Sequence, residues 1–286
     1  MGMKNNMRIL ITGGNSSVSR YVRPLLSEDY EVITIGRRDC DINLDPNRSL
    51  ADQLPDHVDI VIHTAASFGG DTEEEIYETE KFNVLNTMNL CFQLRKMNVK
   101  HFIHISSIFV HLEDTSPYNS IYSISKRHSE DIVKFCLKKE EIPYTILRPS
   151  QLYGNDPSFI THHPFLYQII EMASKGQKIS LYGNHGASAN YLHIKDFSEV
   201  LYRVVKKCVL GEYDCTTMAP NTYLEIARNV FELTNNTISI ELLKDKEESG
   251  NVFKYDDTIY KKVNYYPKVS IKGGLSEILN ATRVLY

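Results

Sequence analysis

The sequence predicts an α/β fold built on a doubly wound parallel sheet. Two observations predict it: short apolar segments alternate with helix-like ones, and the first of them runs into a glycine turn. Strands that alternate with helices are typical of a parallel sheet covered on both faces. The segments that read as buried strands of this sheet are residues 8–12, 31–35, 58–63 and 102–106.

Composition limits the class of protein. The chain has 286 residues, 42% hydrophobic and 24% charged, which predicts one large domain or two interlocked ones. The net charge is −4 and basic blocks are absent from the sequence, which argues against nucleic acid or anionic membrane as partners. The sequence shows neither an 18-residue apolar run nor a secretory leader. The five cysteines are scattered and form no CxxC pair, which fits a reducing cytoplasm better than a disulfide framework or a zinc site.

The first strand is followed by the turn Gly13-Gly14-Asn15-Ser16-Ser17 and by a helix over residues 18–26. This order opens a dinucleotide-binding unit of the Rossmann type, in which the helix N-terminus holds the pyrophosphate. Ser16 and Ser19 stand where glycines are expected. The serine hydroxyls can donate to phosphate, so weakened binding is one interpretation. The other is a plain strand–turn–helix without a nucleotide.

The second strand ends in Gly36-Arg37-Arg38. An acidic residue at this place usually holds the 2′-hydroxyl of NAD, whereas an arginine accommodates the 2′-phosphate of NADP. The two arginines therefore favour NADP over NAD, although they could be solvated surface residues. Asp41 and Ile42 follow at positions from which a side chain could reach the adenine.

Small and polar residues follow the next two strands. Thr64, Ala65 and Ala66 come after His63 and leave room for a cofactor at the carboxyl end of the sheet. Ser106 and Ser107 end the strand at residues 102–106, and Ser107 could hydrogen-bond a substrate carbonyl; Ser-Ser after a strand is also ordinary turn chemistry. Asn83, in a helix predicted over residues 82–94, could orient the backbone of the site or simply be polar.

Tyr122 and Lys126 lie four residues apart in a helix predicted over residues 122–137. Positions four apart share a helix face, so the ammonium would stand beside the phenol. A nearby cation lowers the pKa of a phenol from about 10, which would let Tyr122 exchange a proton with a carbonyl or alcohol. Tyr and Lys at this spacing on an ordinary solvated helix are the alternative.

Taken in order, these segments resemble the extended branch of the short-chain dehydrogenase/reductase superfamily, which contains nucleotide-sugar epimerases, dehydratases and reductases. Two later segments are more diagnostic. Leu147-Arg148-Pro149-Ser150-Gln151-Leu152-Tyr153-Gly154 resembles the family's "LRP…YG" segment, which contacts the nicotinamide. Tyr191-Leu192-His193-Ile194-Lys195-Asp196 resembles its "FIHVDD" segment, which opens a helix of the substrate domain. The similarity runs from about residue 8 to about residue 230.

The resemblance implies roles for individual residues. Tyr122 would be the general acid/base, Lys126 would lower its pKa and hold the nicotinamide ribose, and Ser107 would hydrogen-bond the reacting oxygen. Substrate contacts are expected from Ser107, His111, Gln151 and His193, and no metal is expected, the pair His162-His163 included. The implied cofactor-binding residues are Gly13, Asn15, Ser16, Ser17 and Val18 at the pyrophosphate, Arg37 and Arg38 at the 2′-phosphate, Asp41 and Ile42 at the adenine, and Thr64, Ala65, Ala66, Asn83, Ser106, Tyr122, Lys126 and Pro149 elsewhere.

Three departures from the family pattern bear on the reaction. Ile108 and Phe109 follow Ser107 where the family's dehydratases carry an acidic pair, which argues against elimination of water. The interval from Ser107 to Tyr122 is short, so a substrate-side loop is trimmed. The family's arginine near the "FIHVDD" segment is Ala189 or Asn190 here, which removes the usual grip on the diphosphate.

By this resemblance, residues 1–154 form the NAD(P)-binding Rossmann domain, to which residues 186–215 return, and residues 155–286 form most of a smaller, discontinuous substrate-binding domain. Within the second part the sequence predicts a polar loop at residues 155–163, a turn at 182–190 and a charged loop at 244–250. The remaining elements are helices over 165–174, 196–208 and 221–234, with Asn221 or Thr222 as N-cap of the third, and strands over 178–181 and 211–215. Residues 255–266 and 271–281 end the chain and contain no recognisable catalytic pattern.

Three functions are weighed. The favoured one is an NADP-dependent 4-keto reductase of a nucleotide-activated sugar, cytoplasmic and contributing a deoxyhexose to surface polysaccharide. The alternative is an NAD-dependent nucleotide-sugar 4-epimerase, and the third is a non-catalytic NADP-sensing protein. The resemblance also implies a homodimer joined through helices 82–94 and 122–137 of each subunit.

Overall fold

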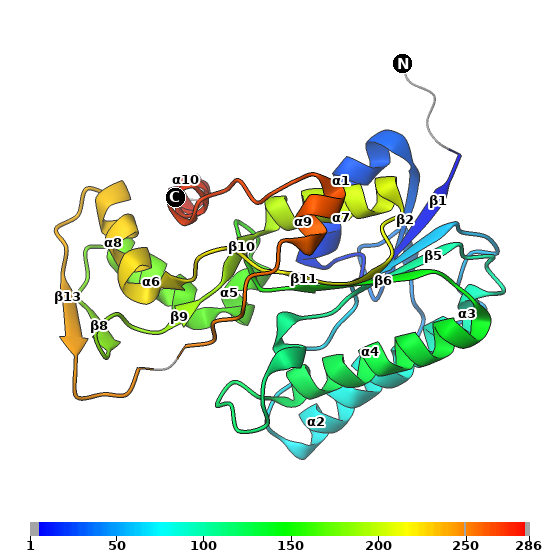
Figure 1. Cartoon of the computed structure of the whole chain (residues 1–286), viewed down its shortest axis with the longest axis horizontal. Helices are drawn as coiled ribbons and strands as arrows, with labels where there is room; N and C mark the ends of the chain where they lie inside the picture. Colours follow the sequence, from blue (N-terminus) through cyan, green and yellow to red (C-terminus); the bar gives the residue numbers. More distant parts are fainter. Residues whose placement is uncertain (1–5, 249, 284–286) are drawn as a thin grey trace. The chain divides into compact units, whose positions relative to one another are not determined.

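A computed structural model of the chain describes residues 6–248 and 250–283 (Figure 1). Ser249 of the predicted charged loop and the outermost residues of both predicted domains lie outside the described residues. The chain divides into two compact units. The first comprises Met1–Pro149 and Ser198–Asp214, and the second Ser150–Phe197 and Cys215–Tyr286.

The first unit is built on a seven-stranded sheet with the order β11-β6-β5-β4-β1-β2-β3. The neighbours β3-β2-β1-β4-β5-β6 all pair in parallel. The doubly wound α/β fold is therefore confirmed. The strands are β1 (Arg8–Thr12), β2 (Glu31–Gly36), β3 (Ile42–Asn43), β4 (Ile60–His63), β5 (His101–Ile105), β6 (Tyr144–Pro149) and β11 (Gly211–Cys215).

The central strands β4 and β5 are buried along their whole length because both faces of the sheet are covered. All residues of β4 and β5 are buried, and Ile9, Leu10 and Ile11 of β1 are fully inaccessible. From β1 the chain proceeds to β2 on one side, while β4 lies on the other. Doubly wound sheets bind their ligands at such a reversal, in the crevice beyond the carboxyl ends of the strands, which here means the ends of β1 and β4.

Helices cover both faces of this sheet. Figure 1 shows α3 (Asn86–Leu94) and α4 (Ile121–Glu140) on one face, and α1 (Ser17–Asp29) and the first unit's part of α7 (Ile194–Lys207) on the other. The hydroxyl of Tyr202 on α7 donates to Asp29 at the end of α1 over 2.7 Å. The main core cluster joins sheet and helices through side chains such as Val61, Phe102, Leu90, Leu94, Val133 and Leu137.

The helix predicted over residues 82–94 begins earlier and is not uniform. The structure has α2 (Glu73–Glu80), a π-helical segment η1 (Lys81–Leu85) and then α3. Thr72 and Glu75 form a capping box at the start of α2, and three glutamates occupy its first turn. Sequence periodicity missed α2 because Thr79 is its one buried residue, so no apolar stripe marks it.

In the described part of the second unit, residues 150–197, 215–248 and 250–283, there are three two-stranded sheets and five helices besides the start of α7. The predicted loop 155–163 contains the short helix Ser158–His162, and the predicted turn 182–190 contains the two-residue strand Ser188–Ala189. The strand Ile240–Leu243 and the helices Thr258–Val263 and Ile271–Arg283 were not predicted; all of these elements but the last are too short for a periodic pattern. Thr222, not Asn221, is the N-cap of the helix Tyr223–Leu233.

The paired strands are β7 (Gln151–Tyr153) with β10 (Tyr191–His193), β8 (Ile179–Tyr182) with β13 (Ile240–Leu243), and β9 (Ser188–Ala189) with β12 (Asn221–Thr222). The helices are α5 (Ser158–His162), α6 (Pro164–Ser174), α8 (Tyr223–Leu233), α9 (Thr258–Val263) and α10 (Ile271–Arg283). Throughout residues 6–248 and 250–283, every helix falls short of the length or apolarity needed to span a bilayer.

Candidate active site

The glycine turn lies directly after β1, at the crevice. Gly13 has a φ of +70°, and a Cβ there would lie 2.7 Å from the backbone of Ala65. Only glycine fits this close crossing of two chain segments. The turn leads into the N-terminus of α1, a 13-residue helix whose free N–H groups and dipole suit a pyrophosphate.

Ser16 does not project freely from this turn. It is the N-cap of α1, and its hydroxyl accepts from the Ser19 amide over 3.1 Å and shares a hydrogen bond of 2.8 Å with the Thr64 hydroxyl. Ser17 and Val18 are buried in the first turn of α1. The predicted hydroxyl–phosphate contact of Ser16 therefore competes with two internal hydrogen bonds. Arg20, which sequence reasoning did not single out, donates to the carbonyl oxygens of Asn15 over 2.5 and 2.7 Å and so holds the outer side of the turn.

The predicted adenine and 2′-phosphate residues lie in the segment after β2. Arg37 and Arg38 are exposed, with the Arg37 guanidinium 6.0 Å from the centre of the Phe82 ring. The Asp41 carboxylate accepts from the backbone amide and the hydroxyl of Thr34 over 2.8 Å each, and pairs with Arg23 at 2.9 Å. Asp41 thus fixes the backbone of this segment, while the half-buried Ile42 belongs to β3.

Helix α4 brings Tyr122 and Lys126 together with Ser107. Ser120 starts the helix through a capping box with Ser123, which places Tyr122 in its first turn. A hydrogen bond links the Tyr122 phenol to Ser107, which stands at the tip of β5 as N-cap of the 3-10 turn η2 (Ile108–His111). Lys126 is 2% exposed, and its Nζ donates to the Ile105 carbonyl over 2.7 Å.

The acidity of the phenol differs from expectation. Burial raises the pKa of Tyr122 to about 12, and the hydrogen bond with Ser107 acts in the opposite direction without reversing the shift. The prediction that Lys126 brings the pKa of this phenol below its ordinary value is therefore wrong for this arrangement. Burial in turn lowers the pKa of Lys126 to about 8. The raised pKa makes Tyr122 a proton donor at neutral pH. Burial makes the charged form of Lys126 less favourable than it would be in water.

Asn83 ties the site's backbone together. Its Oδ1 accepts from the Ser67 amide over 2.7 Å, and its Nδ2 donates to the Ser67 carbonyl over 2.8 Å and to the Ser125 hydroxyl of α4 over 2.9 Å. The next residue, Phe68, stacks on the Tyr122 ring at 4.9 Å between centroids. Sequence reasoning found Asn83 but missed Phe68, since no pattern marks a single aromatic residue in a loop.

The remaining predicted residues fall into two groups. In the first unit, Thr64 donates to the Thr12 carbonyl over 2.7 Å, and His111 pairs with Asp214 at 3.0 Å. Ala65 and Ala66 are half-buried beside the turn, Ser106 is buried, and Pro149 ends β6. Gln151 and His193 lie in the second unit, on the paired strands β7 and β10.

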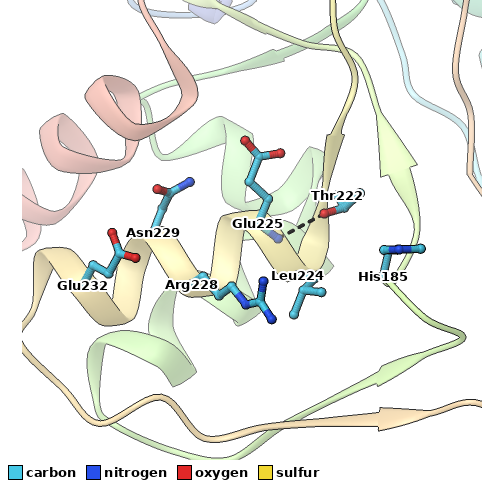
Figure 2. Close-up of a pocket in the computed structure, with 7 residues that line it drawn as sticks. All are labelled: His185, Thr222, Leu224, Glu225, Arg228, Asn229 and Glu232. Atoms are coloured by element: carbon cyan, nitrogen blue, oxygen red, sulfur yellow. Dashed lines mark hydrogen bonds between the residues drawn. The ribbon is translucent and has the colours of Figure 1, made fainter.

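The second unit has an open hollow of about 360 Å³ along α8 (Figure 2). It is lined by His185, Thr222, Leu224, Glu225, Arg228, Asn229 and Glu232, none of which belongs to the predicted site. Figure 2 shows Arg228 and Leu224 leaving the helix on one side and Glu225 and Asn229 on another. Side chains of opposite charge diverge here, so the hollow offers no convergent set of ligands. In the described part of the chain, no group of three or more His, Cys, Asp and Glu side chains could hold a metal ion.

Comparison with known proteins places this geometry in context. Residues 9–214 match the model of the NAD dependent epimerase/dehydratase family. A provisionally named UDP-glucose 4-epimerase from Methanocaldococcus jannaschii is 24% identical over 95% of this chain and 97% of its own. The bovine dTDP-D-glucose 4,6-dehydratase (Bos taurus) is 22% identical over 95% of this chain and 87% of its own.

Solved structures show the same fold. The UDP-N-acetylglucosamine 4-epimerase from Bacillus cereus superimposes with a TM-score of 0.77 at 20% identity, covering 97% of each chain. The UDP-glucuronic acid 4-epimerase from Bacillus cereus, in complex with UDP-glucuronic acid and NAD, gives a TM-score of 0.78 at 20% identity over 98% of this chain and 100% of its own. The resemblance drawn from the sequence is thereby confirmed.

Proposed function

Because the chain belongs to the NAD dependent epimerase/dehydratase family, we propose that it is an NAD-dependent nucleotide-sugar 4-epimerase. The relatives and structural neighbours named as 4-epimerases support this reaction over the 4-keto reduction that the sequence favoured. The observation that carries the proposal is the Ser107–Tyr122 hydrogen bond beside a buried Lys126, a set that can hold one sugar oxygen and move its proton.

The residues present fit a dinucleotide. Gly13 makes a cradle that a Cβ would fill, and it opens onto the N-terminus of α1. The turn residues would hold the pyrophosphate, and Lys126 would reach the ribose. When bound, the nicotinamide supplies the acceptor and donor of a hydride.

Tyr122 and Ser107 would act on the C4 oxygen of the sugar. The step starts from the phenolate form of Tyr122: as the hydroxyl becomes a carbonyl, its proton passes to the phenolate oxygen, and Ser107 keeps a hydrogen bond to the substrate oxygen. In the return step, on the opposite face of the sugar, Tyr122 gives the proton back. A phenol with a raised pKa is a weak acid and its phenolate a strong base, so the ammonium of Lys126 matters most when Tyr122 has lost its proton.

Dehydration fits this chain less well, although several relatives are dehydratases. Elimination of water needs a second acid/base pair at neighbouring carbons. Ile108, 1% exposed, and Phe109 stand directly after Ser107, and neither can carry a proton.

NADP-dependent 4-keto reduction is the second candidate. It is favoured by Arg37 and Arg38, both exposed after β2 with no acidic residue at the strand tip. The two candidates differ in stoichiometry, since a reductase consumes one NADPH per sugar whereas an epimerase regenerates its cofactor.

The experiment incubates the purified protein with UDP- and dTDP-hexoses and follows products by NMR and cofactor by absorbance. We expect the 4-epimer to appear while total reduced cofactor stays constant. Stoichiometric loss of NADPH with a 4-keto sugar nucleotide would establish the reductase instead. Binding without turnover of any sugar would support the NADP-sensing alternative.

We also propose that the protein is a cytoplasmic homodimer. Phe92 on α3 and Phe135 on α4 are 56% and 71% exposed, on the two helices expected to meet a second copy. Exposed aromatic residues on adjacent helices are typical of an interface. The five cysteines are free thiols, which supports a reducing compartment.

Phe135→Glu is expected to convert the dimer to a monomer in light scattering, because it would bury a charge in an apolar contact. Met218→Glu, at a residue 76% exposed in the second unit, is the matched control and is expected to leave the mass unchanged. A wild-type monomer at all concentrations would contradict the dimer.

A further inference from the structure

Glu130 lies one helical turn beyond Lys126 on α4, on the same face of the helix. Its side chain is 4% exposed, and it is held by Arg148 of β6 in a bidentate pair. Nε of Arg148 donates to Oε1 over 2.8 Å, and Nη2 donates to Oε2 over 2.6 Å. Two parallel charge-assisted hydrogen bonds fix the orientation of a carboxylate more firmly than a single contact does.

Arg148 is itself anchored from β11. Its Nη2 also donates to Glu212 over 2.6 Å, and its Nη1 lies 3.5 Å from Asp214. The guanidinium is 12% exposed and therefore shielded from solvent screening. Arg148 is thus shared among three carboxylates, so Glu130, which also lies 3.9 Å from the Nζ of Lys134, is not fully neutralised by it and can act on other cations nearby.

Lys126 needs such a countercharge. The titratable groups that act on it or feel its charge are His63 on β4, His104 on β5 and Glu130 on its own helix, while Tyr122 lies one turn before it on α4. Burial keeps both histidines neutral, with the pKa of His63 lowered to about 3. Among the described residues, Glu130 is the one anion that acts to raise the pKa of Lys126, against the burial that lowers it to about 8.

We infer that Glu130, oriented by Arg148, is a positioning residue that keeps Lys126 in its ammonium form and thereby sets the alkaline limit of the reaction. The claim about the alkaline limit rests on the proposed function, whereas the claim about the charge of Lys126 does not. With its countercharge, Lys126 stays mostly protonated at neutral pH; without it, a large share of the lysine loses its charge and the Tyr122 phenolate loses its stabilising cation.

The test titrates Lys126 directly, by NMR of protein carrying an isotope label on the lysine Cε atoms. The Lys126 signal is the one that disappears in Lys126→Met. In Glu130→Gln we expect its titration midpoint to fall by about one pH unit, a tenfold loss of proton affinity. Glu130→Asp, which keeps the charge, is expected to restore most of the shift.

Two further variants separate this role from simple stability. Glu212→Gln removes the other tight partner of Arg148 and is expected to leave the Lys126 midpoint in place. The double variant Glu130→Gln/Arg148→Met removes both members of the buried pair, so no unpaired arginine remains if the single variant folds poorly. It is expected to show the same downward shift.

The pH profile of kcat completes the experiment, because its alkaline limb should move with the NMR midpoint. An unchanged midpoint in Glu130→Gln, or an equal shift in Glu212→Gln, would overturn the inference. A shifted midpoint in a protein that turns over no nucleotide sugar would leave the inference about the ammonium standing and refute the proposed function instead.

Discussion

Tyr122→Phe is expected to lower kcat for the nucleotide sugar by at least about 100-fold, with little change in KM. The substitution removes the oxygen that hydrogen-bonds Ser107 and receives the substrate proton, while the ring keeps its stacking contact with Phe68. Since burial raises the pKa of the phenol to about 12, the phenolate that accepts the substrate proton is the minor form of Tyr122 in the free enzyme. The measurement is the initial rate of epimer formation.

Tyr77→Phe is the matched control. Tyr77 lies on α2 in the same unit and is 64% exposed, so the same atomic change there should leave kcat unchanged. Both variants should unfold at the wild-type temperature. Full activity in Tyr122→Phe would mean that another group moves the proton.

Acid is expected to destabilise the protein steeply below pH 6.5. Three histidines of the central strands are buried: His63, His101 and His104. Burial lowers the pKa of His63 to about 3, that of His101 to about 4, and that of His104 well below its ordinary value. The unfolded chain protonates these residues near pH 6.5, whereas the folded protein does not protonate them until about pH 4 or below.

The sign follows from this difference in proton uptake. Between about pH 6 and pH 4.5 the unfolded state binds about three more protons, so the free energy of unfolding falls as the pH falls. Each group contributes about 1.4 kcal/mol per pH unit, which gives a slope of about 4 kcal/mol per pH unit near pH 5. Urea unfolding at several pH values measures it.

His101→Gln should reduce this slope by about a third while keeping a polar group near Thr145, to which the His101 Nε2 is hydrogen-bonded at 2.7 Å. His185→Gln, at a side chain 63% exposed, should leave the slope unchanged. If His101→Gln and His185→Gln gave the same slope as the wild type, His101 would not be one of the groups that drive acid unfolding.

The sequence allowed most strands of the large sheet to be located along the chain because each strand is encoded locally. The middle residues of β1, Ile9, Leu10 and Ile11, are apolar and the strand ends just before Gly13, and a strand was predicted at residues 211–215, where the structure has β11. Helix α2 escaped prediction because its contacts are few and its surface is acidic. Periodicity detects an apolar stripe, and a helix without one leaves no such signal.

The candidate site was less predictable than the fold. The spacing of Tyr122 and Lys126 is visible in the sequence, but the pKa of each depends on burial by segments distant in the chain. The Ser16 hydroxyl is hydrogen-bonded to Thr64, 48 positions away in the chain. Glu130 is hydrogen-bonded to Arg148, 18 positions away. Such partners are set by tertiary packing, so neither composition nor periodicity reveals them.

The edge strand β11 of the first unit's sheet is synthesised long after its neighbour β6. Strand β6 ends at Pro149, yet its neighbour β11 begins only at Gly211, after residues 150–197 of the second unit have been made. During synthesis β6 therefore presents an open edge with unpaired backbone groups, the kind of edge that recruits other chains. We therefore expect a chain truncated within residues 150–197 to aggregate more readily than the full chain.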